Sequence, residues 1–347
     1  MARGIQLEQA IFEYLASRKA GGAKPNTLRN LRNDLTTVLA AAGNIPTTRI
    51  DGRTVDIVFT KASARRGPAA LNNLHTNMGK FFRWLRARGY MDLNTDPLFG
   101  HSTRQVPARE RRRVPLADFP RLLDAAYHPR DRMVVALGLF LFLRQSEISS
   151  LTVGDVDLAS GEILVTVHKT GEVDRMPISA ELDAELRRWL TFYTRQCGPL
   201  SDGWLLCPAK RALHVTNGPG GLFQRSPVVD DRLLPDRRMV KIEDVAKRAL
   251  TGIGWDTNGQ WEGIHTLRRS GARAMFDELV AAGYDGALRQ VQVMLHHKAG
   301  TMTERYLGLT LDKQKRNASI RGKNLFPSLA STTVTTLGEV EVRVVNS

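Results

Sequence analysis

Apolar residues recur at every third or fourth position through much of the first hundred residues, which is the spacing of one buried helix face. The stripes run over 7–15, 28–39 and 71–85, and the second begins directly after Pro25-Asn26-Thr27. A proline in the first turn is typical of a helix start. These stripes predict a helical bundle of four or five short helices over residues 1–100.

A different pattern follows the third stripe. Residues 101–113, HSTRQVPARERRR, have no apolar periodicity and contain five arginines. We interpret them as a basic linker between two domains, able to stretch over roughly 40 Å.

From residue 114 to about 325 the pattern predicts a second, mainly helical domain. Helices are expected at 116–127, 131–143, 180–194, 239–251, 266–281, 285–296 and 301–309. Alternating residues at 161–168 and 173–178 flank Thr170-Gly171 and predict a β-hairpin. Residues 210–237, rich in Gly, Pro and Asp, predict a long surface loop. In the tail 326–347, residues 332–345 alternate as a strand does. The fold class expected is mainly α with a small antiparallel sheet, in two domains.

Composition excludes several classes of protein. The longest apolar run, Met133–Leu143, is eleven residues, too short to span a bilayer. Residues 1–9 contain no long apolar stretch of the kind found in a signal peptide. Two cysteines, Cys197 and Cys207, cannot build a disulfide framework or a four-cysteine zinc site, so a reducing cytoplasm is the expected compartment.

The charge is the most informative number. The chain has 50 Lys and Arg against 35 Asp and Glu, a net charge of +15, which favours a polyanionic partner such as nucleic acid. Residues 1–100 have a net charge of +8 and residues 101–113 one of +4, so most of the excess lies in the first third. A basic solubility face or a disordered tail is the alternative. It is less favoured because the charges are interleaved with helical apolar residues.

Four sets of residues have the chemistry that cleaving a phosphodiester without metal requires: cations for the nonbridging oxygens, a nucleophile, and an acid for the leaving oxygen. They are Arg144 with Glu147, Lys169 at the hairpin tip, His265 with Arg268, and His297 with Tyr306 nine residues later. Each set alone has a plainer interpretation: a helix-end ion pair, a solvated turn lysine, a chance His-x-x-Arg pair, and a core tyrosine. Their order along the chain is what makes them informative.

That order resembles the signature of the tyrosine recombinases, also called the phage integrase family. The resemblance covers about residues 5–320. It includes Arg144-Gln-Ser-Glu147, Lys169 in a hairpin that continues into Met176-Pro177-Ile178, His265-Thr-Leu-Arg268, and the spacing from His297 to Tyr306. The N-terminal bundle, ending in KFFRWL and NTDP, resembles the family's core-binding domain.

The boxes depart from the family in four places. Phe142 stands where members usually have Gly in Thr-Gly-Leu-Arg, and His296 where they have Gly in Leu-Gly-His. Either His296 or His297 could face phosphate, and the nine-residue spacing favours His297. The lysine lies in His168-Lys169-Thr170 where Gly-Lys-Gly is common. The stretch from Arg268 to His297 is longer than usual, with residues 281–286 as the expected insertion.

The resemblance implies a C-shaped DNA clamp with a helical core-binding domain at 1–100, a linker at 101–113 and a catalytic domain at 114–325. It implies that Tyr306 attacks the scissile phosphate, that Arg144, Arg268 and His297 hold its oxygens, and that Glu147 supports Arg144. Lys169 would protonate the leaving 5′-oxygen, and His265 would assist the proton movement on Tyr306. Neither metal nor ATP is expected, and four protomers would assemble on double-stranded DNA. The tail could dock on a neighbouring protomer.

Charge suggests which side chains contact DNA. They are Arg65, Arg66, Lys80, Arg83, Arg111, Arg112 and Arg113.

The type of recombinase stays open at this point. A phage or mobile-element integrase, with possible directionality or host accessory factors, is favoured over an Xer-type resolvase, and a separate arm-binding module before residue 5 is not expected. A type IB topoisomerase shares the tyrosine chemistry. A DNA-binding regulator without catalysis is the alternative from a different class, and the intact six-residue set argues against it.

Overall fold

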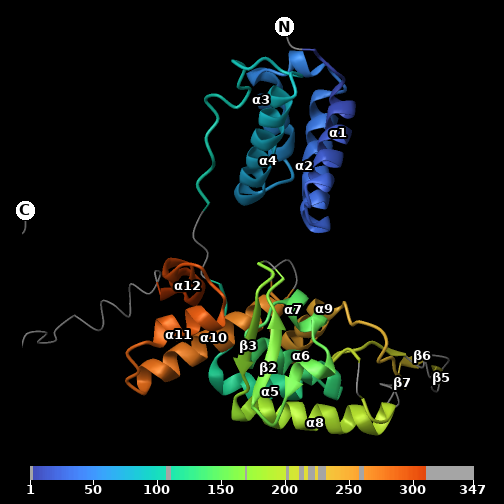
Figure 1. The fold of residues 1–347 in the computed structure, drawn as a ribbon, viewed down its shortest axis with the longest axis vertical. Coiled ribbons are helices and arrows are strands. Elements are labelled where there is room, and N and C mark those ends of the chain that lie inside the picture. The colour runs from blue at the N-terminus through green and yellow to red at the C-terminus, as the bar shows by residue number, and fades with distance from the viewer. Residues whose placement is uncertain are drawn as a thin grey trace, which may run out of the picture. The chain divides into compact units, whose positions relative to one another are not determined.

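The computed structural model describes residues 3–106, 111–168, 170–200, 203–210, 215–217, 223–225, 232–257 and 262–309. Contacts divide the chain into two units, Met1–Arg109 and Glu110–Ser347 (Figure 1). The division falls inside the segment interpreted as a linker.

The N-terminal unit is an all-helical bundle, as predicted. Its helices are α1 (Leu7–Ala20), α2 (Pro25–Ala42), α3 (Gly52–Ser63) and α4 (Pro68–Ala87), with a 3₁₀ turn η1 at Thr47–Arg49. Proline starts α2 and α4, and Asp51 caps α3 by accepting a 2.9 Å hydrogen bond from the Thr54 backbone. The apolar stripes meet in one core that includes Leu35, Leu74 and Phe81, all fully buried. Burial of these stripes is the main stabilisation of the unit.

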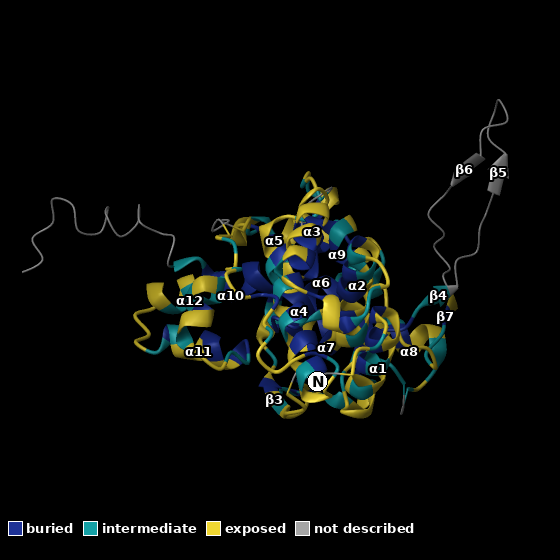
Figure 2. Ribbon diagram, turned by 90° about the horizontal axis from the view of Figure 1, so that it is seen from above, coloured by how far each residue is buried: buried dark blue, intermediate teal, exposed yellow. Residues whose placement is uncertain are grey.

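The C-terminal unit is mainly helical with a small sheet, which confirms the expected fold class. Its helices are α5 (Phe119–Asp124), α6 (Pro129–Phe140), α7 (Gln145–Ser150), α8 (Ala180–Cys197), α9 (Ile242–Gly252), α10 (Ile264–Ala281), α11 (Ala287–Met294) and α12 (Gly300–Leu307), with 3₁₀ turns η2 (Leu116–Asp118) and η3 (Val153–Asp155). Helix α6 is buried over residues 133–139, and α8, α9 and α10 pack against it. Figure 2 colours the elements by burial.

The sheet has the order β1–β2–β3 and is antiparallel. Strand β1 (Val156–Asp157) was not predicted, whereas β2 (Glu162–Thr166) and β3 (Val173–Pro177) form the predicted hairpin. Val165 pairs with Asp174 in its register. The turn is closed by backbone bonds from Thr170 and Gly171 to the Val167 carbonyl, and Gly171 has the positive φ (85°) that favours glycine.

The crossing of α6 and α10 is very close. A Cβ added at Gly271 would overlap the carbonyl oxygen of Leu139, and one at Gly138 would lie 3.0 Å from the Ile264 side chain. Glycine therefore lets the backbone of α10 approach α6 more closely than any other residue would allow. This approach fixes the position of the first turns of α10, where His265 and Arg268 lie.

Two sequence predictions are wrong in detail. The buried helix predicted at 131–143 ends at Phe140, because Phe142 adopts a left-handed conformation with φ 54°. Arg144 is consequently the residue before α7 and does not end α6. Residues 210–237 are not loop throughout. They contain β5 (Val215–Asn217), β6 (Phe223–Arg225) and β7 (Arg232–Leu233), and β4 (Ala209–Lys210) overlaps their start. The predicted tail strand at 332–345 lies outside the described residues.

Candidate active site

Arg268 lies one turn into α10 and is almost fully buried, with 1% of its surface exposed. Its Nη1 donates to the Phe142 carbonyl, and its Nη2 donates to the Leu295 carbonyl at 2.7 Å. Burial lowers the pKa of Arg268 to about 10, which still leaves the guanidinium charged at neutral pH. A guanidinium has five N–H donors, so two carbonyl bonds leave others for an anion.

Arg144 shares a carboxylate with Arg268. Its Nη1 donates to Glu147 Oε1 at 2.7 Å, while its backbone nitrogen donates to Oε2 at the same distance. Glu147 is 1% exposed, and its Oε2 is 3.8 Å from Nη1 of Arg268. One buried negative charge therefore faces two positive charges, and the net positive charge that remains favours an incoming anion.

The Leu295 carbonyl brings both arginines to one point, because Arg144 Nη2 also donates to it at 3.4 Å. Leu295 directly follows the last residue of α11, and His296 turns the chain with φ 51°. Among the described residues, Phe142 and His296 are the two non-glycine residues with positive φ. At both positions the tyrosine recombinases usually have glycine. Arg268 binds the carbonyl of Phe142 and the carbonyl of Leu295, the residue before His296.

His297 and Tyr306 face each other across the turn into α12. Their rings meet edge to face, with centroids 5.3 Å apart and planes at 83°. His297 Nδ1 is hydrogen-bonded to the hydroxyl of Thr303 at 3.1 Å, and Thr303 is fully buried. Gln292 holds the His297 backbone on both sides, by accepting from its nitrogen at 3.1 Å and donating to its oxygen at 3.0 Å. The imidazole is thus fixed in orientation beside the phenol.

Tyr306 is partly buried, and its hydroxyl donates to the backbone oxygen of His265 at 3.4 Å. Burial raises the pKa of the Tyr306 hydroxyl, and the charges of Arg268, Arg269 and Arg144 act in the opposite direction. The phenol is therefore protonated at neutral pH and lies in the field of three guanidinium groups. Those charges would stabilise negative charge that develops on its oxygen or on a bound phosphate.

His265 is the second residue of α10. The protein packed around its imidazole, followed by the charges of Arg268 and Arg144, lowers its pKa from the usual value, although the residue is accessible to solvent. A neutral imidazole at pH 7 can accept a proton.

Sequence reasoning missed Arg269 and Arg273 at this site, and it assigned a third arginine, Arg113, to DNA contact. Arg269, 3% exposed, donates to the Arg112 backbone oxygen at 2.8 Å and lies 3.5 Å from buried Glu262. Arg113 and Arg273 both donate to the Leu307 carbonyl at the end of α12, at 2.6 and 2.9 Å. The only sequence signal was that Arg269 directly follows Arg268.

The structure separates the predicted DNA contacts into two groups. Arg65, Lys80, Arg83 and Arg111 are exposed, and so is Arg112. Arg112, Arg66 and Arg113 also make contacts within the protein. Arg66 pairs with Asp34 at 2.5 Å, Arg112 stacks on Trp255 at 4.1 Å, and Arg113 holds α12.

Lys169, the predicted acid, lies outside the described residues.

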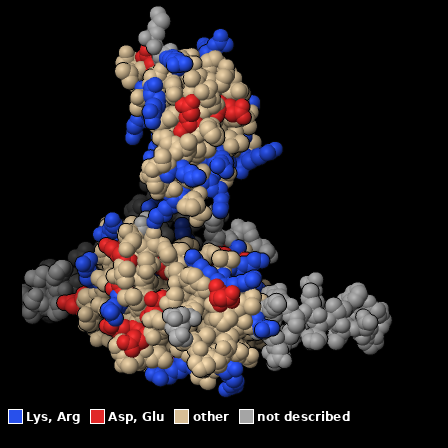
Figure 3. Space-filling model, turned by 45° about the vertical axis from the view of Figure 1, so that its right-hand side comes forward, with Lys and Arg blue, Asp and Glu red and all other residues tan. Residues whose placement is uncertain are grey.

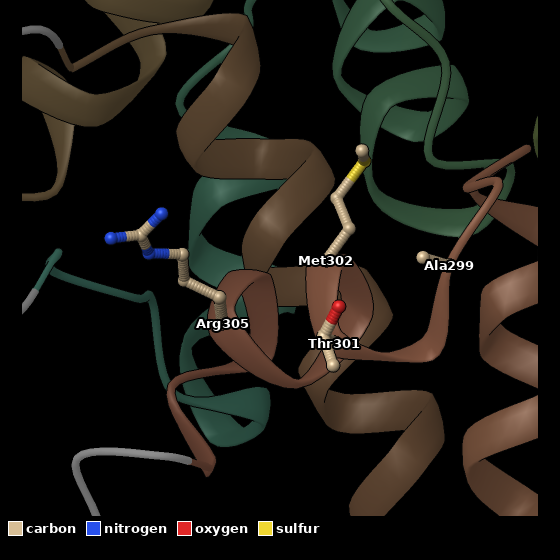
Figure 4. Close-up of a pocket in the computed structure, with 4 residues that line it drawn as sticks. All are labelled: Ala299, Thr301, Met302 and Arg305. Carbon is tan, nitrogen blue, oxygen red and sulfur yellow. The ribbon is translucent and has the colours of Figure 1, made fainter.

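A pocket on α12 is lined by Ala299, Thr301, Met302 and Arg305, which the sequence analysis did not single out (Figure 4). The pocket lies beside the helix that bears Tyr306. No described helix is long and apolar enough to cross a membrane.

The sequence model of the phage integrase family matches residues 112–312. Tyrosine recombinase XerC of Salmonella typhi is 29% identical over 174 residues, which are 48% of this chain and 57% of that protein. The XerC of Escherichia coli strain K12 / DH10B is 30% identical over 138 residues, 38% of this chain and 45% of that protein. The chain thus aligns with about half the length of these curated relatives.

Solved structures show the same fold. A lambda integrase dimer bound to a COC′ core site superposes with a TM-score of 0.65 at 16% identity, covering 88% of this chain and 78% of that one. XerH site-specific recombinase, in a post-cleavage complex with palindromic difH substrate, gives 0.62 at 14% identity, covering 88% and 83%. At these identities the likeness extends to the fold alone.

Proposed function

The chain belongs to the phage integrase family, and from this we propose that it is a site-specific DNA recombinase that cuts and rejoins strands through a phosphotyrosyl intermediate. The observation that supports the proposal most is the meeting of Arg144 and Arg268 at the Leu295 carbonyl, beside the His297–Tyr306 pair. Two guanidinium groups, an imidazole and a phenol are the groups that metal-free phosphoryl transfer requires.

In the proposed first step the Tyr306 oxygen attacks phosphorus. The bond from the tyrosine oxygen to phosphorus forms while the bond from phosphorus to the 5′-oxygen breaks. The phenolic proton passes to His265, and Lys169 supplies a proton to the departing 5′-oxygen. Strand rejoining runs the same step in reverse with a new 5′-hydroxyl. One phosphoester replaces another, so the exchange needs neither ATP nor a metal ion.

Arg144 and Arg268 would hold the nonbridging oxygens, because the fork of a guanidinium matches the spacing of phosphate oxygens. His297 would donate a further hydrogen bond from Nε2, since Nδ1 already bonds to Thr303. The Tyr306 hydroxyl bonds to the His265 backbone oxygen in the free chain, so attack requires that bond to break first.

The N-terminal unit supports the DNA part of the proposal through a polar groove between α2 and α4. Its lining includes Asn30, Asn33, Asn73, Asn77 and Lys80. Asparagine amides can read adenine edges, and Lys80 together with exposed Arg83 can bind phosphates. Lys and Arg outnumber Asp and Glu on the face of this unit in view in Figure 3. We propose that this groove contacts a double-stranded recombination site, with binding that weakens steeply as salt increases.

The finer parts of the proposal rest on family resemblance. We propose a phage or mobile-element integrase that acts in the cytoplasm of a bacterial host. Recombination breaks two duplexes on both strands, so four protomers on DNA fit the task. Directionality or host factors, and docking of the tail on a neighbour, belong to the same proposal.

A nicked suicide substrate tests the chemistry. The nick lets a short 5′-hydroxyl fragment diffuse away after cleavage, so the covalent protein–DNA product accumulates and is seen on a denaturing gel. The wild-type chain should give this band, and Tyr306→Phe should bind the same DNA without giving it. A band from Tyr306→Phe would show that another residue is the nucleophile. No band from the wild type on its own recombination site, recovered by sequencing the junctions in cells, would overturn the proposal.

A further inference from the structure

His296 makes a contact between two elements that are distant in sequence. Its Nε2 lies 2.9 Å from Oδ2 of Asp174, which is in strand β3. A carboxylate accepts hydrogen bonds, so His296 Nε2–H is the donor. The His296 side chain is 11% exposed, and that of Asp174 is 41% exposed. This pair links the turn between α11 and α12 to the hairpin.

The hairpin is also held by the sheet and by the core, in which Met176 of β3 is 1% exposed. Strand β3 is an edge strand that pairs only with β2 in the three-stranded sheet. His168, where β2 gives way to the turn, has its Nε2 2.7 Å from the Ser150 hydroxyl. On the β3 side, His296 is the described residue that an ion pair connects to Asp174. Loss of this contact would leave the β3 side of the hairpin less restrained.

His296 occupies a backbone conformation that is unfavourable for it. Its φ is 51°, a left-handed value that glycine adopts freely and that a residue with a Cβ adopts at a cost. Its Nδ1 is buried and has no hydrogen-bond partner within the described part of the chain. Both the left-handed backbone and the unpaired buried nitrogen are unfavourable for a histidine at this position. The hydrogen bond to Asp174 compensates for them.

We propose that His296 is a positioning residue whose hydrogen bond to Asp174 fixes the β2–β3 hairpin against the α11–α12 turn, and so places the hairpin's proton donor at the leaving oxygen. The inference rests on the proposed recombinase function. The same turn presents the Leu295 carbonyl to Arg144 and Arg268 and carries His297. One link would therefore align the acid with the groups that hold the phosphate.

The variants His296→Gly and Asp174→Ala remove the link in different ways. Glycine keeps the left-handed turn and loses only the imidazole, so the carbonyl of Leu295 should stay in place. Asp174→Ala removes the acceptor and keeps the histidine. Arg175→Gln is the matched control, because Arg175 is the next residue of β3, 67% exposed, and pairs with Glu162 and not with His296.

The readout is the single-turnover rate of covalent product formation with two substrates. One is the ordinary nicked site. The other has sulfur in place of the bridging 5′-oxygen, and a thiolate leaves without needing a proton. We expect both variants to lose about tenfold or more in rate with the oxygen substrate and to match the wild type with the sulfur substrate. The double variant should be no slower than the slower single variant. Arg175→Gln should match the wild type on both.

Several results would overturn the proposal. An equal loss on both substrates would mean that the pair supports the fold in general and does not place the acid. Unchanged rates on both would mean that the hairpin needs no such link. Failure of the recombinase function is distinguishable, because then the wild type itself gives no covalent product with either substrate.

Discussion

Arg113 donates a 2.6 Å hydrogen bond to the carbonyl of Leu307, the last residue of the helix that carries Tyr306. Arg273 donates to the same oxygen at 2.9 Å. Two guanidinium groups thus hold the carboxyl end of α12, where the helix dipole favours positive charge. Arg113 lies near the start of the C-terminal unit and Arg273 lies in α10, so the orientation of Tyr306, the proposed nucleophile, depends on both segments.

Replacing Arg113 should loosen α12 with little effect on overall stability. We expect Arg113→Ala to lower the free energy of unfolding by only about 1 kcal/mol, the usual size of one hydrogen bond. Amide hydrogens of α12 should exchange faster with solvent, and covalent product should form more slowly. Arg112→Ala, which removes a neighbouring cation that does not contact α12, is the control. Unchanged exchange in α12 would contradict the role assigned to Arg113.

Arg144→Lys keeps the positive charge and removes the fork. Because Arg144 contacts both Glu147 and the Leu295 carbonyl, a single ammonium cannot replace its geometry. The rate of covalent product formation should fall on the order of 10²-fold, while DNA affinity stays nearly constant. A rate within threefold of the wild type would mean that charge alone is sufficient there.

Glu147→Gln should destabilise the C-terminal unit. It removes the buried carboxylate that compensates Arg144 and Arg268, and we expect a loss of about 3 kcal/mol in urea unfolding. Asp183→Asn is the matched comparison, because Asp183 pairs with Arg187 at 2.7 Å on the exposed face of α8. The loss of unfolding free energy in Asp183→Asn should stay below about 0.5 kcal/mol. Similar losses for the two variants would contradict the electrostatic account of the site.

The lowered pKa of His265 predicts a pH dependence. If the neutral imidazole is the proton acceptor, as proposed, cleavage should persist as the pH falls through about 6.5, the value for free histidine, and should decline only below it. The stability of the fold should change with pH in the same direction as the cleavage rate. The unfolded chain binds a proton near pH 6.5 and the folded chain does not, so folding weakens as the pH falls below that value. Single-turnover rates from pH 5 to 8 test this, and an acid limb above 6.5 would contradict it.

Gly271→Ala should weaken the contact between α6 and α10. The added methyl would meet the Leu139 carbonyl, and we expect a loss of about 1–3 kcal/mol. The same change at Gly79 in α4 meets only Leu98 Cδ1 at 3.4 Å, so it should be neutral or stabilising by up to about 1 kcal/mol. Thermal unfolding of both variants gives the comparison. A stabilised Gly271→Ala would show that α10 can move away from α6 without cost.

Local patterns predicted most of the elements. The 3–4 spacing of apolar residues placed the helices of both units except α3 and α7, and the alternation around Thr170-Gly171 placed the hairpin. Phe142 shows where such patterns fail. An apolar residue inside an apolar run predicts a continued helix, yet here it adopts a left-handed turn so that its carbonyl reaches Arg268. That conformation is set by a partner 126 residues away, which no local pattern contains.

The candidate site likewise contains residues that the sequence predicted and residues that it did not. Residue types and their order singled out Arg144, Arg268, His297 and Tyr306, because phosphate chemistry needs those groups. Arg269 and Arg273 were missed, and Arg113 was expected to contact DNA, because their roles depend on burial and on backbone carbonyls brought close only by folding. Among 50 basic residues, sequence alone cannot distinguish an arginine that binds a carbonyl from one that faces solvent.

The bond from the Tyr306 hydroxyl to the His265 carbonyl has a consequence for the unoccupied enzyme. A neutral phenol that already donates its hydrogen is a weak nucleophile. Under the proposed function, Tyr306 would therefore become reactive only after a bound phosphodiester displaced this bond, so that nicking away from a recombination site would be slow without any separate inhibitor.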